Sequence, residues 1–283
     1  MKITVVGLGV VGGSFVKALK DTDYEVYGVD IDEDTLRQAK EEGCIIEGYT
    51  DGHEIIKESD LTIICLYPTL ILDFLKDMTF KPGSIVSDVV GIKSYFLEKA
   101  LKLLPDDVEY ISVHPMAGRE NKGYAYADAE VFKGANFIVI QHTLNKQSSI
   151  EKMQKFAEDL GFKSVRIMSP YDHDEIVSYT SQLAHVLAVS LINSDTQKYE
   201  TGKYIGDSFR DLTRIANINE DLWTELFFNN KDFLFQSIDR FEKELDVIKR
   251  CVKEEDEEVL KQRFIEARKR RLKLEENDMR ENR

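Results

Sequence analysis

The stretch KITVVGLGVVGGS, residues 2–14, decides the fold because a β-branched run passes directly into a glycine-rich turn. Residues 2–6 are typical of a buried strand, and residues 10–20 are expected to form a helix. In such a unit the first glycine permits the tight turn, the second lets a pyrophosphate approach the backbone, and the third lets helix and strand pack closely. The positions expected to bind a dinucleotide are Gly7, Leu8, Gly9, Val10, Val11 and Gly12.

An acidic residue, Asp30, ends the second expected strand about 20 residues after the glycine turn. A carboxylate at this position hydrogen-bonds the ribose hydroxyls of the adenosine half of the cofactor and repels a 2′-phosphate. The sequence therefore favours NAD over NADP. Alternatively, Asp30 only caps the next helix, a role for which Asp32 is an equally good candidate.

Strand-like and helical segments alternate through the first part of the chain, which implies a parallel sheet covered by helices on both faces. Later strands of this layer are expected at residues 61–65, 84–88, 109–113, 137–141 and 163–167. From Pro170 onward there is no further proline, and helical periodicity takes over. We therefore expect an α/β fold with a Rossmann-type dinucleotide-binding domain at residues 1–169, followed by an all-helical domain at residues 170–283.

The net charge, the cysteines and the apolar runs of the sequence indicate which partners and which cell compartment to expect. The 283 residues carry a formal net charge of -14, which argues against nucleic acid or an anionic membrane as the main partner. Cys44, Cys65 and Cys251 are scattered and form no ligand-like pair, as in a protein of the reducing cytosol. No apolar run approaches the roughly 18 residues of a membrane span. A cytoplasmic protein is expected, and no metal site, because the histidines lack HExxH-like spacing.

The segment SVHPMAGRE, residues 112–120, follows the end of an expected strand. Strand ends of this fold face the cofactor crevice, and histidine exchanges a proton near neutral pH, so His114 is the candidate catalytic residue. Together with GLGVVGGS at 7–14 and RDLTRIA at 210–216, the HPMAG motif resembles the motifs of prephenate dehydrogenases in order and spacing. The resemblance extends from Met1 to about Asn230.

The resemblance implies oxidative decarboxylation of prephenate to 4-hydroxyphenylpyruvate with reduction of NAD, a step of tyrosine biosynthesis. His114 would take the proton of the ring hydroxyl as hydride leaves for the nicotinamide. Arg214 would clamp a carboxylate of the dianionic substrate through its planar guanidinium. The other residues expected near the substrate are Ser181 and His185, which share one helix face, and Thr213 beside Arg214.

Further expectations concern the surroundings of these residues. Trp223 either closes the site or only packs beside it, and His173 is expected to support the domain junction rather than touch substrate. A homodimer through the helical domain is expected by family analogy. The apolar stretches 183–192 and 222–235 also exceed what one small domain hides.

Several positions depart from the family pattern. Family members often carry Asp-x-Gly-Ser-x-Lys after the fifth strand, whereas this chain has DVVGIK at residues 88–93, so Gly91 replaces the serine that assists the histidine. Ser94 or a water would replace the hydroxyl, or the assistance is absent. Asp88, which opens this segment, is expected at the cofactor site. Arg119 stands where a small hydroxyl residue is usual and is expected to pair with the second substrate carboxylate or to face solvent.

Two other functions remain open from the sequence. Arogenate dehydrogenase shares the fold, the hydride step and the decarboxylation, and its substrate carries an amino group in place of the side-chain keto group. A non-catalytic dinucleotide-sensing protein is a different class, suggested by the loss of the serine at Gly91. The retention of His114 and Arg214 counts against it.

Overall fold

The glycine turn lies between a buried strand and the helix that packs on it. A computed structural model describes residues 1–117 and 122–277. Strand β1 (Lys2–Val6) is followed by helix α1 (Val10–Leu19), as predicted. The six-stranded parallel sheet has the order β3-β2-β1-β4-β5-β6, which reverses between β1 and β4. In such sheets ligands bind where the order reverses, outside the carboxyl ends of the strands.

The remaining strands of this sheet are β2 (Glu25–Val29), β3 (Glu47–Tyr49), β4 (Leu61–Ile64), β5 (Ile85–Asp88) and β6 (Glu109–Tyr110). The helices that alternate with them are α2 (Glu33–Glu41), α3 (His53–Ile56), α4 (Pro68–Asp77) and α5 (Ser94–Leu101). Alternate residues of β1 enter two cores: Val5 packs with α1 and α2, and Val6 packs with α3, α4 and α5. The central strands are therefore buried on both faces, as expected for a parallel sheet.

The last three strands form a second sheet, so the prediction that they continue the first layer is wrong. Strands β7 (Val113–Pro115), β8 (Asn136–Ile140) and β9 (Ser164–Met168) pair in that order, with β7 antiparallel to β8. The expected strand 109–113 is divided between the two sheets. Two side chains bond the free edge of β6 at the Tyr110 carbonyl: Asn145 Nδ2 donates to it at 3.0 Å, and His142 Nε2 lies 2.9 Å from it. Helix α6 (Gln147–Asp159) joins β8 to β9 and packs on the same core as α1.

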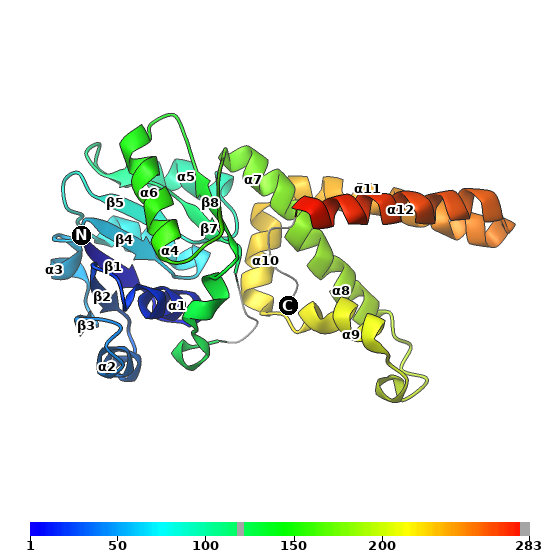
Figure 1. The fold of residues 1–283 in the computed structure, drawn as a ribbon, viewed down its shortest axis with the longest axis horizontal. Coiled ribbons are helices and arrows are strands. Elements are labelled where there is room, and N and C mark those ends of the chain that lie inside the picture. The colour runs from blue at the N-terminus through cyan, green and yellow to red at the C-terminus, as the bar shows by residue number, and fades with distance from the viewer. Residues whose placement is uncertain (118–121, 278–283) are drawn as a thin grey trace.

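The described residues from Pro170 onward form helices. Ser169 caps α7 (Pro170–Val177) by accepting a hydrogen bond from the Asp172 backbone N–H at 3.1 Å, and α7 continues through the π-helical turn η3 (Ser178–Gln182) into α8 (Leu183–Asn193). The remaining helices are η4 (Thr201–Lys203), α9 (Asp207–Thr213), η5 (Arg214–Ala216), α10 (Glu220–Asn229), α11 (Lys231–Glu254) and α12 (Glu257–Asn277). Figure 1 shows α7 beside the sheets and the α11–α12 hairpin projecting away from them.

Candidate active site

The glycine turn has the shape that the sequence predicts. Gly7 has φ +84°, a conformation that side chains disfavour, and a Cβ on Gly12 would lie 1.9 Å from the Gly7 carbonyl oxygen. A Cβ on Gly9 would meet no atom within 4 Å, so the backbone there is open to a ligand. Gly9 begins α1 without a side-chain cap, which leaves the N–H groups of the first turn available to an anion.

Asp30 ties the end of β2 to the glycine turn. Its Oδ2 accepts a hydrogen bond from Leu8 N at 2.6 Å, and its Oδ1 accepts one from Asp32 N at 2.9 Å. The cap of α2 is Asp32, whose side chain accepts from Asp34 N at 3.0 Å. The alternative in which Asp30 only caps the helix is therefore wrong, since a neighbouring residue holds that position.

Asp88 lies inside the protein at the end of β5, with 1% of its surface exposed. Tyr110 donates its hydroxyl hydrogen to Oδ2 at 2.6 Å, Val90 N donates to Oδ1 at 2.9 Å, and Lys93 Nζ lies 3.2 Å from Oδ1. The structure thus supplies Asp88 with internal partners. The direct cofactor contact predicted for it stays a prediction.

Lys93 is fully buried and joins the two sheets. Its Nζ donates to the Val113 carbonyl at 2.7 Å, at the start of the strand that carries His114. Burial lowers the pKa of Lys93, while the neighbouring Asp88 carboxylate opposes that shift. Lys93 is the last residue of the DVVGIK segment, so this segment positions β7 through a side chain that the sequence did not single out.

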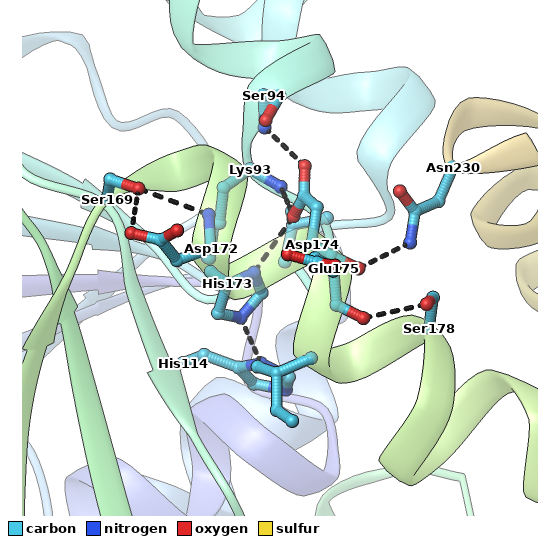
Figure 2. Close-up of polar contacts among 12 residues, drawn as sticks. Lys93, Ser94, His114, Ser169, Asp172, His173, Asp174, Glu175, Ser178 and Asn230 are labelled. Atoms are coloured by element: carbon cyan, nitrogen blue, oxygen red, sulfur yellow. Dashed lines mark hydrogen bonds and ion pairs between the residues drawn. The ribbon is translucent and has the colours of Figure 1, made fainter. Parts of the chain in front are cut away.

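His114 lies on β7 and meets a histidine from the helical part of the chain (Figure 2). Its Nδ1 is 2.8 Å from Nε2 of His173, and His173 Nδ1 is 2.9 Å from Asp174 Oδ1. His173 and Asp174 are 0% and 1% exposed. Burial, with the nearby His173 and Lys93, lowers the pKa of His114 well below its usual value. His114 is therefore neutral at neutral pH and able to accept a proton.

His173 does more than the sequence predicted. It supports the domain junction, as expected, because α7 packs on α5 and Asp174 accepts hydrogen bonds from the backbone N–H groups of Lys93 and Ser94, each at 2.8 Å. It also contacts the candidate catalytic histidine directly. The signal available in the sequence was the adjacent pair His173-Asp174 at the start of a helix, but no spacing rule connects that pair to His114, 59 residues earlier.

Gly91 lies against the ring of His114. A Cβ built on Gly91 would be 3.9 Å from His114 Cε1 and 3.8 Å from Leu226 Cδ2, both ordinary contact distances. A serine at this position would therefore place its hydroxyl beside the histidine. Ser94, one of the suggested replacements, begins α5; its backbone N–H donates to Asp174, and its side chain also hydrogen-bonds Asp174.

The predicted substrate residues of the helical part lie on η3, on α8 and on the segment that packs against α8. His185 Nδ1 is 2.9 Å from the Ser181 carbonyl oxygen, and the ring of His185 stacks on Trp223 with centroids 3.6 Å apart. Arg214 begins η5, which contacts α8, and its side chain is exposed. Trp223 thus packs on the predicted pocket histidine.

For two predicted substrate residues, Thr213 and Arg119, the structure does not test the predicted contact with substrate. Thr213 donates its hydroxyl hydrogen to the Phe209 carbonyl at 2.6 Å, within its own helix. Arg119 lies outside the described residues. The substrate contacts predicted for both stay predictions.

Comparisons with known proteins connect this geometry to a family. Residues 15–166 match the model "Prephenate dehydrogenase, nucleotide-binding domain", and residues 169–266 match "Prephenate dehydrogenase, dimerization domain". A prephenate dehydrogenase of Bacillus subtilis is 28% identical over 94% of this chain and 74% of its own length. A cyclohexadienyl dehydrogenase of Zymomonas mobilis is 26% identical over 96% of this chain and 95% of its own.

Among solved structures, a prephenate dehydrogenase from A. aeolicus in complex with hydroxyphenyl propionate and NAD+ superposes with a TM-score of 0.87. It is 26% identical, and the match covers 97% of this chain and 98% of that one. The two family models between them span both the sheet part and most of the helical part. The chain belongs to the prephenate dehydrogenase family.

Proposed function

We propose that this chain oxidises and decarboxylates prephenate to 4-hydroxyphenylpyruvate with NAD as the hydride acceptor. The observation that carries the proposal is the pair of contacts that joins His114 on β7 to His173 and Asp174 on α7, at 2.8 and 2.9 Å. Burial also lowers the pKa of His114, which favours the proton-accepting form. The family membership and the relatives named prephenate dehydrogenase support the substrate. The family membership and the presence of the candidate catalytic residue His114 also weigh against a non-catalytic sensor.

The residues of the glycine turn fit NAD. The open backbone at Gly9 and the uncapped start of α1 suit a pyrophosphate, and the Asp30 carboxylate suits the ribose hydroxyls. Bound NAD supplies an acceptor for the hydride that leaves C4 of the substrate ring. The protein contributes the orientation of the two reactants and the exclusion of water around them.

His114 provides the proton acceptor. The C4 hydroxyl of prephenate becomes a carbonyl as hydride departs, so its proton must move to a base. His114 would accept this proton, and loss of the ring carboxylate as CO2 would then give the aromatic product. We assign Arg214 to the carboxylate of the substrate, and Ser181 of η3 and His185 of α8 to further substrate contacts.

Arogenate is the alternative substrate within the same mechanism. The relatives that align over nearly the whole chain include a cyclohexadienyl dehydrogenase as well as prephenate dehydrogenases, so the substrate range varies among similar sequences. An amino group in place of the keto group changes neither the hydride step nor the role of His114. Parallel assays with the two substrates separate the possibilities.

The helical part supports a homodimer. Residues 169–266 match the family's dimerization domain. Residues Pro170–Asn193 are long and apolar enough to cross a membrane by length and composition alone. However, this stretch carries buried polar groups, His173, Asp174 and Gln182, that pair within the protein, which fits a helix packed inside the family's dimerization domain better than a membrane span. We extend the proposal to a cytoplasmic location, where Cys44, Cys65 and Cys251 remain free thiols, as in the structure.

The decisive experiment follows the absorbance of NADH with purified protein, NAD, and prephenate or arogenate, for the wild type and His114→Asn. We expect turnover that falls by about 10²–10⁴-fold in the variant, the usual contribution of a general base, with unchanged NAD binding. Because the pKa of His114 is lowered, the wild type should keep its activity down to a pH below about 6.5 before protonation removes the base.

The controls distinguish the alternatives. Turnover with arogenate alone would keep the mechanism and change the substrate. Absence of turnover with both substrates, despite tight NAD binding, would contradict the proposed function and favour a sensor.

A further inference from the structure

We propose that His173 and Asp174 fix the tautomer of His114 in this chain, a positioning role that compensates for the hydroxyl missing at Gly91. The inference rests on the proposed function, in which His114 is the base. Its starting observation is geometric: His114, His173 and Asp174 form an unbroken line of contacts of 2.8 and 2.9 Å from the sheet part into α7 (Figure 2).

The line begins at a carboxylate that can only accept hydrogen bonds. Asp174 faces the backbone N–H groups of Lys93 and Ser94 as well as the imidazole of His173. Burial alone would raise the pKa of Asp174, but these donors outweigh it and hold the pKa below its usual value. An ionised carboxylate has no proton to give. The shared hydrogen therefore belongs to His173, and Nδ1 of His173 is the protonated nitrogen.

The tautomer of His173 in turn determines the tautomer of His114. Burial keeps the pKa of His173 below its usual value, although Asp174 opposes the shift, so His173 is neutral. A neutral imidazole protonated on Nδ1 can only accept at Nε2. His114 Nδ1 must then donate the hydrogen across the 2.8 Å contact, which leaves the lone pair of His114 on Nε2. That is the form in which Nε2 can take a proton from a substrate hydroxyl.

The charged groups around His114 and His173 affect how readily each histidine takes up a proton. Besides Asp174 on α7, Lys93 on the β5–α5 loop lies near the two histidines. Lys93 forms an ion pair with Asp88, and the Tyr110 hydroxyl donates a hydrogen bond to the same carboxylate. Lys93 disfavours a cation on either histidine. Asp174 is in direct contact with His173, so through His173 it stabilises the imidazolium that forms when His114 accepts the proton.

The arrangement also connects the base to the domain junction. His114 belongs to β7, whereas His173 and Asp174 belong to α7, which is held to α5 by the Lys93 and Ser94 N–H groups. Asn230 Nδ2 further donates to the Asp174 carbonyl at 3.0 Å. The protonation form of His114 is therefore set only when the helical part is correctly seated on the sheet part.

The direct test is NMR of the NAD-bound protein labelled with ¹⁵N-histidine, which reports which ring nitrogen carries hydrogen. We expect His114 and His173 both to be protonated on Nδ1 at neutral pH. A His114 protonated on Nε2 would overturn the inference. Because this measurement needs no substrate, its result tests the tautomer of His114 independently of whether the protein turns over prephenate.

Kinetics of two variants test the consequence. His173→Leu removes the acceptor, and we expect kcat to fall about 100-fold with KM and NAD affinity nearly unchanged. His173→Gln retains an acceptor oxygen near the position of Nε2, and should keep kcat within about tenfold of the wild type. Equal losses in the two variants, or no loss in His173→Leu, would show that His173 does not act through this hydrogen bond. Thermal unfolding of both variants checks that the fold is intact, and the NMR result decides if either fails to fold.

Discussion

The two halves of the active site are built in different ways. The cofactor half is contiguous: Gly7 to Gly12 and the Asp30 carboxylate lie within one strand–turn–helix unit and the next strand. The histidine half is assembled from residues far apart in sequence, with His114 on β7 and His173 on α7. A contiguous site is specified by local backbone geometry, whereas an assembled site depends on how two parts of the chain pack. The two halves should therefore respond differently to substitution.

The largest effect is expected in the contiguous half, for Gly12→Ala. The added Cβ would lie 1.9 Å from the Gly7 carbonyl oxygen, which is backbone and cannot swing aside. We expect unfolding to become easier by about 4 kcal/mol or more, the range of severe substitutions, and NAD binding to be lost. Thermal unfolding and NAD titration measure both effects.

Gly9→Ala is the matched control for that variant. A Cβ on Gly9 meets nothing within 4 Å, so the stability of the free protein should be nearly unchanged while NAD binding weakens. If Gly12→Ala and Gly9→Ala unfolded at the same temperature, the tight approach at Gly12 would not be a requirement of the fold.

These contrasts explain which features were predictable. The glycine turn, the Rossmann-type sheet and the helical second part follow from local spacing and periodicity, and the structure contains all three. The division of residues 109–113 between two sheets was not predictable from the strand pattern, because the Tyr110 carbonyl is bonded by the side chains of His142 and Asn145, more than 30 residues further along the chain. The contact between His114 and His173 was missed for a similar reason: neither residue's neighbours in sequence indicate what packs against it.

A smaller effect is expected for Asp30→Asn. The change removes the charge that we propose binds the ribose hydroxyls of NAD, and a hydrogen bond to a charged group contributes about 1.5–3 kcal/mol. We expect the Kd for NAD to rise by about 10- to 100-fold and the discrimination against NADP to shrink, as measured by titration with both cofactors.

Asp32→Asn serves as the control for that change. Asparagine is as good a helix cap as aspartate, and Asp32 is the observed cap of α2. NAD affinity should therefore remain at the wild-type value. Equal weakening by Asp32→Asn and Asp30→Asn would contradict the separate roles of the two carboxylates.

The smallest effect, and the sharpest comparison of the two halves, is expected from Gly91→Ser in the His173→Leu background. The Cβ fits at ordinary distances of 3.8 Å from Leu226 and 3.9 Å from His114, so the backbone need not move. A hydroxyl one bond further out can hydrogen-bond the imidazole. We expect it to restore kcat about tenfold, the worth of one hydrogen bond, relative to Gly91→Ala in the same background. The alanine adds the same carbon without the hydroxyl. Equal rates for serine and alanine would mean that a hydroxyl at position 91 does not act on His114, which would contradict the idea that His173 compensates for its absence.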